Sequence, residues 1–163
     1  MRRIIDKICG GFLAFLMGIM ALDVLWGVFT RYAMGHQASW TEELARFLLI
    51  WIGLLGAAYA SGRNMHLSID LLMPKLGENG QIRLKSIIDA LVATFAFAAM
   101  VLGGSRLIYI TQVLGQLSPA LRLPMALVYS VIPLSGILVV YYKVSQIVAR
   151  FRDLAQTPAA ANK

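Results

Sequence analysis

Long apolar runs separated by charged residues dominate the pattern of this chain. Four such runs are bounded by Lys7 and Arg31, by Arg46 and Arg63, by Lys85 and Arg106, and by Arg122 and Lys143. The runs hold 23, 16, 20 and 20 residues, and the only charged residues inside them are Asp23 and Asp89. Since a membrane-spanning α-helix needs about 20 largely apolar residues, three of the runs qualify directly.

The second run becomes long enough if its helix begins earlier. Ser39-Trp40-Thr41-Glu42 has the pattern of a capping box, in which Ser39 caps the helix and Glu42 follows three residues later. A helix over residues 40–61 would be about 33 Å long, which is enough to cross a bilayer.

We therefore predict an all-α integral membrane protein with four transmembrane helices, at about residues 8–30, 40–61, 86–107 and 123–145. Residues 1–156 are expected to form a single domain, and the tail 157–163 is expected to be disordered. Polar and apolar residues alternate after the second helix. This alternation predicts a short interfacial segment that carries His66 and Asp70 in a cytoplasmic loop.

Composition points to the same class, and charge sets the orientation. Hydrophobic residues make up 59% of the chain and charged residues 14%, whereas a soluble domain has about 25% charged residues. The net charge of +7 is spread between the apolar runs, which argues against a nucleic-acid partner. Eleven Lys and Arg residues flank one side of the predicted membrane and four flank the other. The positive-inside rule then places both termini in the cytoplasm.

Enzymatic chemistry has no support in the residues. Cys9 is the single cysteine. The expected topology puts His36 and His66 on opposite sides of a hydrocarbon core about 30 Å thick, so they cannot hold one haem between them. No residues have the spacing of a metal site, a phosphate-binding loop or a Ser-His-Asp set. We therefore expect no catalytic residue, no metal and no cofactor.

Asp23 is the one ionisable residue well inside a predicted span, and such residues are candidates for a functional site. In one interpretation it is a proton or cation site, as in small four-helix antiporters. In the other it lies in the outer third of its helix, where it reaches water or pairs with a polar group on a neighbouring helix.

The second helix carries a face of small residues: Gly53, Gly56, Ala57 and Ala60, which are spaced at i, i+3, i+4 and i+7. Small residues let another helix approach closely, which is how helices associate in lipid. The partner helix could belong to this chain's own bundle or to another protein, and the pattern favours neither.

Charged residues lie in the first turns of the same helix. Glu42 and Glu43 precede Arg46 by four and three residues, so either carboxylate can meet the guanidinium group on the helix surface. This outer turn, together with Trp40, is interpreted either as a docking patch for a partner or as a helix start with a simple ion pair. Trp40 also suits an aromatic belt at the membrane interface.

Several short motifs occur in an order that resembles a known family. They are Arg31-Tyr32, Ser39-Trp40-Thr41-Glu42-Glu43-Leu44-Ala45-Arg46, Trp51-Ile52-Gly53, Leu55-Gly56-Ala57-Ala58, His66-Leu67-Ser68-Ile69-Asp70, Leu123-Pro124, Tyr129-Ser130 and Pro133. Over nearly the whole chain they are similar to the small membrane subunit, or Q component (DctQ-like), of tripartite ATP-independent periplasmic (TRAP) transporters. Asp23 departs from the family pattern, in which a neutral polar residue is expected.

The resemblance implies a subunit rather than an independent transporter. In that family a large many-span subunit, the M component, holds the sodium and substrate sites. A periplasmic binding protein, the P component, delivers an organic anion such as a C4-dicarboxylate or a sialic acid. The resemblance implies that this chain supports the large subunit in the bacterial inner membrane. The outer turn and the small face are then expected to be its contacts. The alternative is a stand-alone, proton-coupled antiporter that acts as a homodimer through Asp23.

Overall fold

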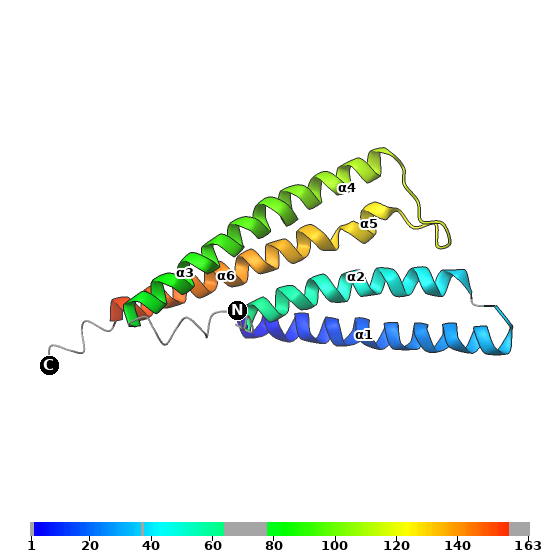
Figure 1. Cartoon of the computed structure of the whole chain (residues 1–163), viewed down its shortest axis with the longest axis horizontal. Coiled ribbons are helices and arrows are strands. Elements are labelled where there is room, and N and C mark those ends of the chain that lie inside the picture. Colours follow the sequence, from blue (N-terminus) through cyan, green and yellow to red (C-terminus); the bar gives the residue numbers. More distant parts are fainter. Residues whose placement is uncertain (1, 37, 64–77, 157–163) are drawn as a thin grey trace.

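The computed structural model describes residues 2–36, 38–63 and 78–156, and its elements there are all helices. They are α1 (Arg2–Ala33), α2 (Ser39–Gly62), α3 (Glu78–Phe95), η3 (Ala96–Gly103), α4 (Gly104–Val113), α5 (Met125–Tyr129) and α6 (Val131–Gln156). The segments α3, η3 and α4 follow one another without a break and form one long helix (Figure 1).

The all-α prediction with four spans is confirmed for the described residues. Four helical stretches are long and apolar enough to cross a membrane: Ile5–Ala33, Ser39–Gly62, Leu84–Val113 and Met125–Phe151. The predicted third span ended too early, because Arg106 lies within the helix and does not end it. The predicted fourth span began two residues too early, because Pro124 has extended backbone angles and precedes the helix.

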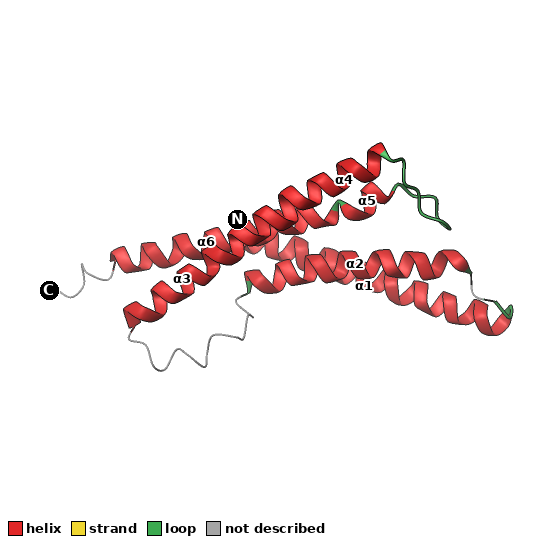
Figure 2. Cartoon of the chain, turned by 45° about the horizontal axis from the view of Figure 1, so that its top comes forward, coloured by secondary structure: helices red, strands yellow, loops and turns green. Residues whose placement is uncertain are grey.

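The helices form a layer in which α2 and α6 are central. The first helix, α1, packs against α2, and α6 lies between α2 and the α3–η3–α4 helix (Figure 1), which crosses α6 in the turned view of Figure 2. The start of α1 and the end of α6 lie at one end of the layer, which we call the terminal end. Residues 114–124, which we call the hairpin loop, lie at the opposite end, the hairpin end.

Burial is greatest in α6 and least in α1. In the apolar window of Met125–Phe151, 39% of the residues are buried, against 11% for Ile5–Ala33. The main apolar cluster joins Leu16 of α1, Leu48 and Leu55 of α2, and Val131 of α6. Most other side chains of α1 are exposed. In a membrane these side chains would contact lipid or another protein.

Glycines allow α6 to approach the α3–η3–α4 helix closely. A Cβ atom at Gly136 would lie 2.7 Å from the Cβ of Met100 in η3, and one at Gly104 would lie 2.9 Å from the Cδ of Pro133. Any larger residue at either position would push the two helices apart. Small residues therefore allow close packing of this helix pair, as is usual for helices in lipid.

The predicted capping box is wrong. Ser39 is the first helical residue of α2, and Ala38 occupies the N-cap position without a side-chain cap. The Thr41 hydroxyl instead donates a hydrogen bond of 2.7 Å to the carbonyl oxygen of Ala38. The helix start is therefore stabilised by a threonine inside the first turn.

A short break separates α5 from α6 three residues before Pro133. Proline has no N–H to donate to the carbonyl group four residues earlier, and its ring clashes with that carbonyl. The carbonyl in question belongs to Tyr129, and α5 ends at that residue. The Ser130 hydroxyl donates a hydrogen bond of 2.6 Å to the carbonyl oxygen of Leu127, which supports the break.

Two predicted segments lie outside the described residues. They are the interfacial segment that carries His66 and Asp70, and the tail 157–163.

Candidate functional site

The outer turn of α2 carries an exposed ion pair. The Arg46 guanidinium group lies 3.6 Å from the Glu42 carboxylate, and the two side chains are 68% and 71% exposed. An exposed pair of this kind contributes little to stability, about 0.3–0.5 kcal/mol when the residues are spaced i, i+4 on a helix. Trp40 is also exposed. These side chains are therefore free to contact another molecule.

Glu43 has a different role within the same turn. Its carboxylate accepts hydrogen bonds from the backbone N–H groups of Ala120 and Leu121, at 2.8 and 2.9 Å. The hairpin loop is further closed by backbone hydrogen bonds of 2.9 Å from Ser118 to Leu123 and 3.0 Å from Met125 to Gln116. Glu43 thus links the hairpin loop to α2 by hydrogen bonds, whereas the side chains of Glu42 and Arg46 are exposed.

The small residues of α2 are at least partly exposed in the part of the chain that the structure describes. A Cβ atom at Gly53 or Gly56 would meet no other atom within 4 Å. Ala57 is exposed and Ala60 is partly exposed. By contrast, a Cβ atom at Gly62 would lie 2.8 Å from the ring of Tyr142. Packing inside the chain therefore accounts for Gly62 but not for the small face.

The small face and the outer turn lie on one side of α2. Helical periodicity aligns these residues, because each follows another by three, four or seven positions. We call the set the open face of α2: Glu42, Arg46, Leu49, Gly53, Gly56, Ala57 and Ala60. Leu49, between the charged and small parts, is 58% exposed. The open face therefore runs from charged residues at the hairpin end to small residues further along the helix.

Asp23 is buried and lacks a partner. Its residue is 6% exposed, and neither carboxylate oxygen has a hydrogen-bond partner among the described residues. It lies on the buried stripe of α1 that also carries Gly27 and Thr30, and the Thr30 hydroxyl is already bonded to the Gly27 carbonyl at 3.0 Å. Both Asp23 oxygens are thus buried, and neither forms a hydrogen bond with a described residue of a neighbouring helix.

Charged side chains meet at the terminal end of the layer. The Asp89 carboxylate of α3 lies 2.8 Å from the Lys143 ammonium group and 2.7 Å from the Arg150 guanidinium group, both on α6. Asp89 and Lys143 are almost completely buried. This buried carboxylate connects α3 to α6 through its two cationic partners. Removal of the carboxylate or of its cationic partners would leave an unpaired buried charge.

The same end also connects α1 and α2 to α6. The Tyr142 hydroxyl donates a hydrogen bond of 2.7 Å to Asp6 of α1. The Gln146 amide donates to the carbonyl oxygens of Ser61 and Gly62, both at 3.1 Å. We call this set of contacts the terminal clasp, and its α6 residues are Tyr142, Lys143, Gln146 and Arg150.

Sequence reasoning missed the terminal clasp. In the sequence, Asp89 lies inside the third apolar run and Lys143 bounds the fourth, and neither position alone indicates a pair. The signal that could have found the pair is their position: two opposite charges at the same end of two antiparallel apolar runs.

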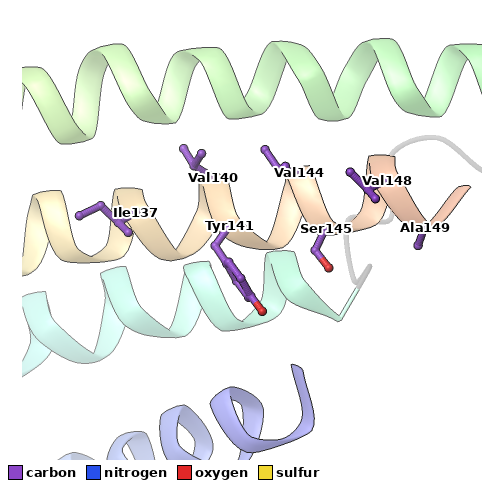
Figure 3. A pocket seen from close by; sticks show the side chains of 7 residues that line it. All are labelled: Ile137, Val140, Tyr141, Val144, Ser145, Val148 and Ala149. Atoms are coloured by element: carbon purple, nitrogen blue, oxygen red, sulfur yellow. The ribbon is translucent and has the colours of Figure 1, made fainter. Parts of the chain in front are cut away.

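One apolar groove of about 540 Å³ lies along α6 (Figure 3). Its lining residues are Ile137, Val140, Tyr141, Val144, Ser145, Val148 and Ala149. Val140 and Val144 point to one side of the helix, and Tyr141 and Ser145 point to the other. No lining residue is charged, so the groove lacks the cationic groups that would bind an organic anion.

His36 is not part of a metal site among the described residues. His36 lies in the connection between α1 and α2, where its Nδ1 atom is 3.0 Å from the carbonyl oxygen of Met34. Within residues 2–36, 38–63 and 78–156, no three His, Cys, Asp or Glu residues gather closely enough to hold a metal ion.

Comparison with known proteins places the chain in a family. The model of the DctQ component of tripartite ATP-independent periplasmic transporters matches residues 20–153. A TRAP transporter small permease protein of Haemophilus influenzae is 33% identical over 124 residues, which cover 76% of this chain and 75% of that protein.

Two further relatives carry more specific names. The sialic acid TRAP transporter small permease protein SiaQ of Vibrio cholerae is 31% identical over 63% of this chain and 60% of that protein. The isethionate TRAP transporter permease protein DctMQ of Oleidesulfovibrio alaskensis is 35% identical over 60% of this chain, but the match covers 15% of that protein. The resemblance seen in the sequence is therefore confirmed. The chain belongs to the DctQ family of TRAP transporter small permease subunits, which are components of a transporter and not enzymes.

Proposed function

We propose that this chain is the small membrane subunit of a sodium-coupled TRAP transporter that imports an organic anion, such as a C4-dicarboxylate or a sialic acid. In this proposal a large many-span subunit carries the sodium and substrate sites, and a periplasmic binding protein delivers the substrate. The small subunit supports the large one as a single transmembrane domain. The observation that carries the proposal is the open face of α2, because no described residue packs against the Cβ positions of its glycines, Gly53 and Gly56.

The open face suits a helix of the large subunit. Without Cβ contacts at Gly53 and Gly56, a partner backbone can come close to α2, and close packing is the main source of helix association in lipid. Glu42 and Arg46 continue this face at the hairpin end, where they could form charged contacts with a partner. Trp40 and Glu43 lie beside it in the same turn. We assign these outer residues to contacts with the large subunit or the binding protein.

The relatives support a partner that carries the transport site. The chain matches 15% of the DctMQ protein of O. alaskensis, so in that relative the matching region is part of a much longer membrane protein. The names of these two relatives refer to sialic acid in one case and isethionate in the other, although both resemble this chain about equally, at 31% and 35% identity. In this proposal, substrate choice belongs to other parts of the transporter.

The proposed orientation places both termini in the cytoplasm of a bacterium and the hairpin loop in the periplasm. The charge count supports it, with eleven Lys and Arg residues on the terminal side and four on the hairpin side. Lys143 and Arg150 are paired with Asp89. Without these two residues the count is nine against four, so the bias remains.

The test is co-purification of the large subunit with tagged small subunit from native membranes. Gly56→Leu and Gly53→Leu place a large side chain on the open face and should reduce recovery of the large subunit several-fold. Gly18→Leu on α1 is the matched control, because Gly18 is also exposed and a Cβ atom there meets nothing within 4 Å.

Equal recovery with all three variants would remove the open face from the interface. Recovery of the chain only as a homodimer, in several mild detergents, would favour the antiporter alternative.

A further inference from the structure

Two aspartates are buried within the spans, and their surroundings differ. Asp89 lies beside two cationic side chains of α6. Asp23 is equally buried, at 6% exposure, but neither of its oxygens has a hydrogen-bond partner among the described residues. Native structures leave few buried polar side chains unpaired, so this residue requires an explanation.

We propose that Asp23 is a buried proton-binding site, whose carboxyl group is protonated and neutral at pH 7 and in that form allows α1 to pack against α2. An ionised carboxylate in an apolar setting is far more costly than a neutral polar group, and such a group takes up a proton instead. Packing of α1 then depends on this proton, because ionisation would place an unpaired charge between the two helices.

The charged groups near this region cannot compensate an ionised Asp23. On α2 they are Glu42, Glu43 and Arg46, and all three have other partners: Glu42 and Arg46 pair with each other, and Glu43 holds the hairpin loop.

The other neighbours offer no cation either. From Met125 to Tyr142, α5 and α6 carry no charged residue, and their titratable groups there are Tyr129, Tyr141 and Tyr142. Of these, Tyr142 donates its hydroxyl to Asp6 at the terminal end. On α1 itself the nearest basic residue is Arg31, which is exposed and lies eight positions from Asp23.

A proton fits the site better than a metal ion. Hard cations in proteins are held by several oxygen ligands. In the part of the chain that the structure describes, no group of three potential ligands surrounds Asp23 or any other residue. A proton needs only the carboxyl group itself.

The direct test is infrared spectroscopy of the purified protein in lipid nanodiscs, together with any subunits that co-purify. A protonated carboxyl group has a C=O stretching band that an ionised one lacks. At pH 7 we expect such a band in the wild-type protein, with a shift when aspartate is labelled with ¹³C at the side-chain carboxyl. Asp23→Asn should abolish the band. Glu42→Gln changes an exposed carboxylate and is the control that should leave it unchanged.

A second measurement follows the thermal stability of the wild type and Asp23→Asn between pH 5 and pH 7. Aspartate in the unfolded chain ionises at about pH 3.9, so folding of the wild type must take up a proton above that pH. Each pH unit should then disfavour folding of the wild type tenfold relative to the variant, whose amide is neutral throughout. Absence of the aspartate band at pH 7, or parallel stability profiles for the two proteins, would overturn the proposal.

Discussion

The Asp89 carboxylate of α3 and the Lys143 ammonium group of α6 lie 2.8 Å apart, with side chains only 8% and 5% exposed. This pair and the Arg150 contact give the terminal end a polar core inside an otherwise apolar layer. Attraction between buried charges is strong, but each charge is costly when it is left alone. The pair therefore connects α3 to α6 at the terminal end.

Replacement of one partner should destabilise the protein strongly. Asp89→Ala leaves Lys143 buried without its carboxylate, and we expect a loss of about 3–5 kcal/mol in the free energy of unfolding. Thermal unfolding in detergent, followed by near-UV circular dichroism, measures the change. Glu42→Ala is the control, since it breaks an exposed pair and should cost less than about 1 kcal/mol.

The double variant Asp89→Ala/Lys143→Met tests whether the loss comes from the unpaired charge. Removal of both partners should recover part of the stability, so the two single changes should be non-additive. Strictly additive effects would show that the two residues act independently.

Two glycines of α2 should respond in opposite ways to the same substitution. Gly62→Ala places a Cβ atom 2.8 Å from the Tyr142 ring and should cost about 1–3 kcal/mol by overpacking. Gly53→Ala meets no atom and should stabilise the isolated chain by up to about 1 kcal/mol, because alanine favours the helix. Thermal unfolding of the two variants side by side provides the measurement. Similar losses in both would mean that the open face is packed within the chain.

Hydropathy made the spans predictable, because each needs only a run of apolar residues. The prediction failed where the end of a span or the cap of a helix depends on a single residue. Arg106 lies within the third span and does not end it, because a long side chain can reach the membrane surface from inside a helix. The sequence pattern of a capping box does not form one here. The Thr41 hydroxyl donates to the Ala38 carbonyl oxygen, and the Glu43 carboxylate accepts a hydrogen bond from the hairpin loop.

The candidate site could be predicted only in part, because the sequence does not show which face of a helix its neighbours cover. The spacing of Gly53 and Gly56 marked a small face, but its openness depends on where α1 and α6 lie. The terminal clasp joins Asp6 to Tyr142 and Asp89 to Lys143. These pairs are 136 and 54 positions apart, and no local pattern reveals such contacts.

Pro133 should control the break between α5 and α6. Pro133→Ala supplies an N–H group that can donate to the Tyr129 carbonyl, so the two helices should merge into one. Amide hydrogen exchange of residues 129–134 should then become slower than in the wild type. Pro124→Ala is the control, because Pro124 precedes the helix and removes no helical hydrogen bond. Unchanged exchange in Pro133→Ala would mean that Ser130 causes the break.

Glu43 should determine the order of the hairpin loop. Its carboxylate accepts the N–H groups of Ala120 and Leu121, and hydrogen bonds to a charged acceptor are stronger than those between neutral groups. Glu43→Ala should therefore raise the amide exchange rates of Ala120 and Leu121 by about tenfold. The overall melting temperature should change little, because the loop lies outside the apolar clusters.

Glu42→Ala removes the neighbouring carboxylate, which pairs with Arg46, and should leave both rates unchanged. If the two variants had the same effect, the loop would be responding to the general charge of the outer turn. An effect confined to Glu43→Ala would show that two adjacent glutamates divide their roles, with Glu43 holding the loop and Glu42 remaining available, beside Arg46, for a partner.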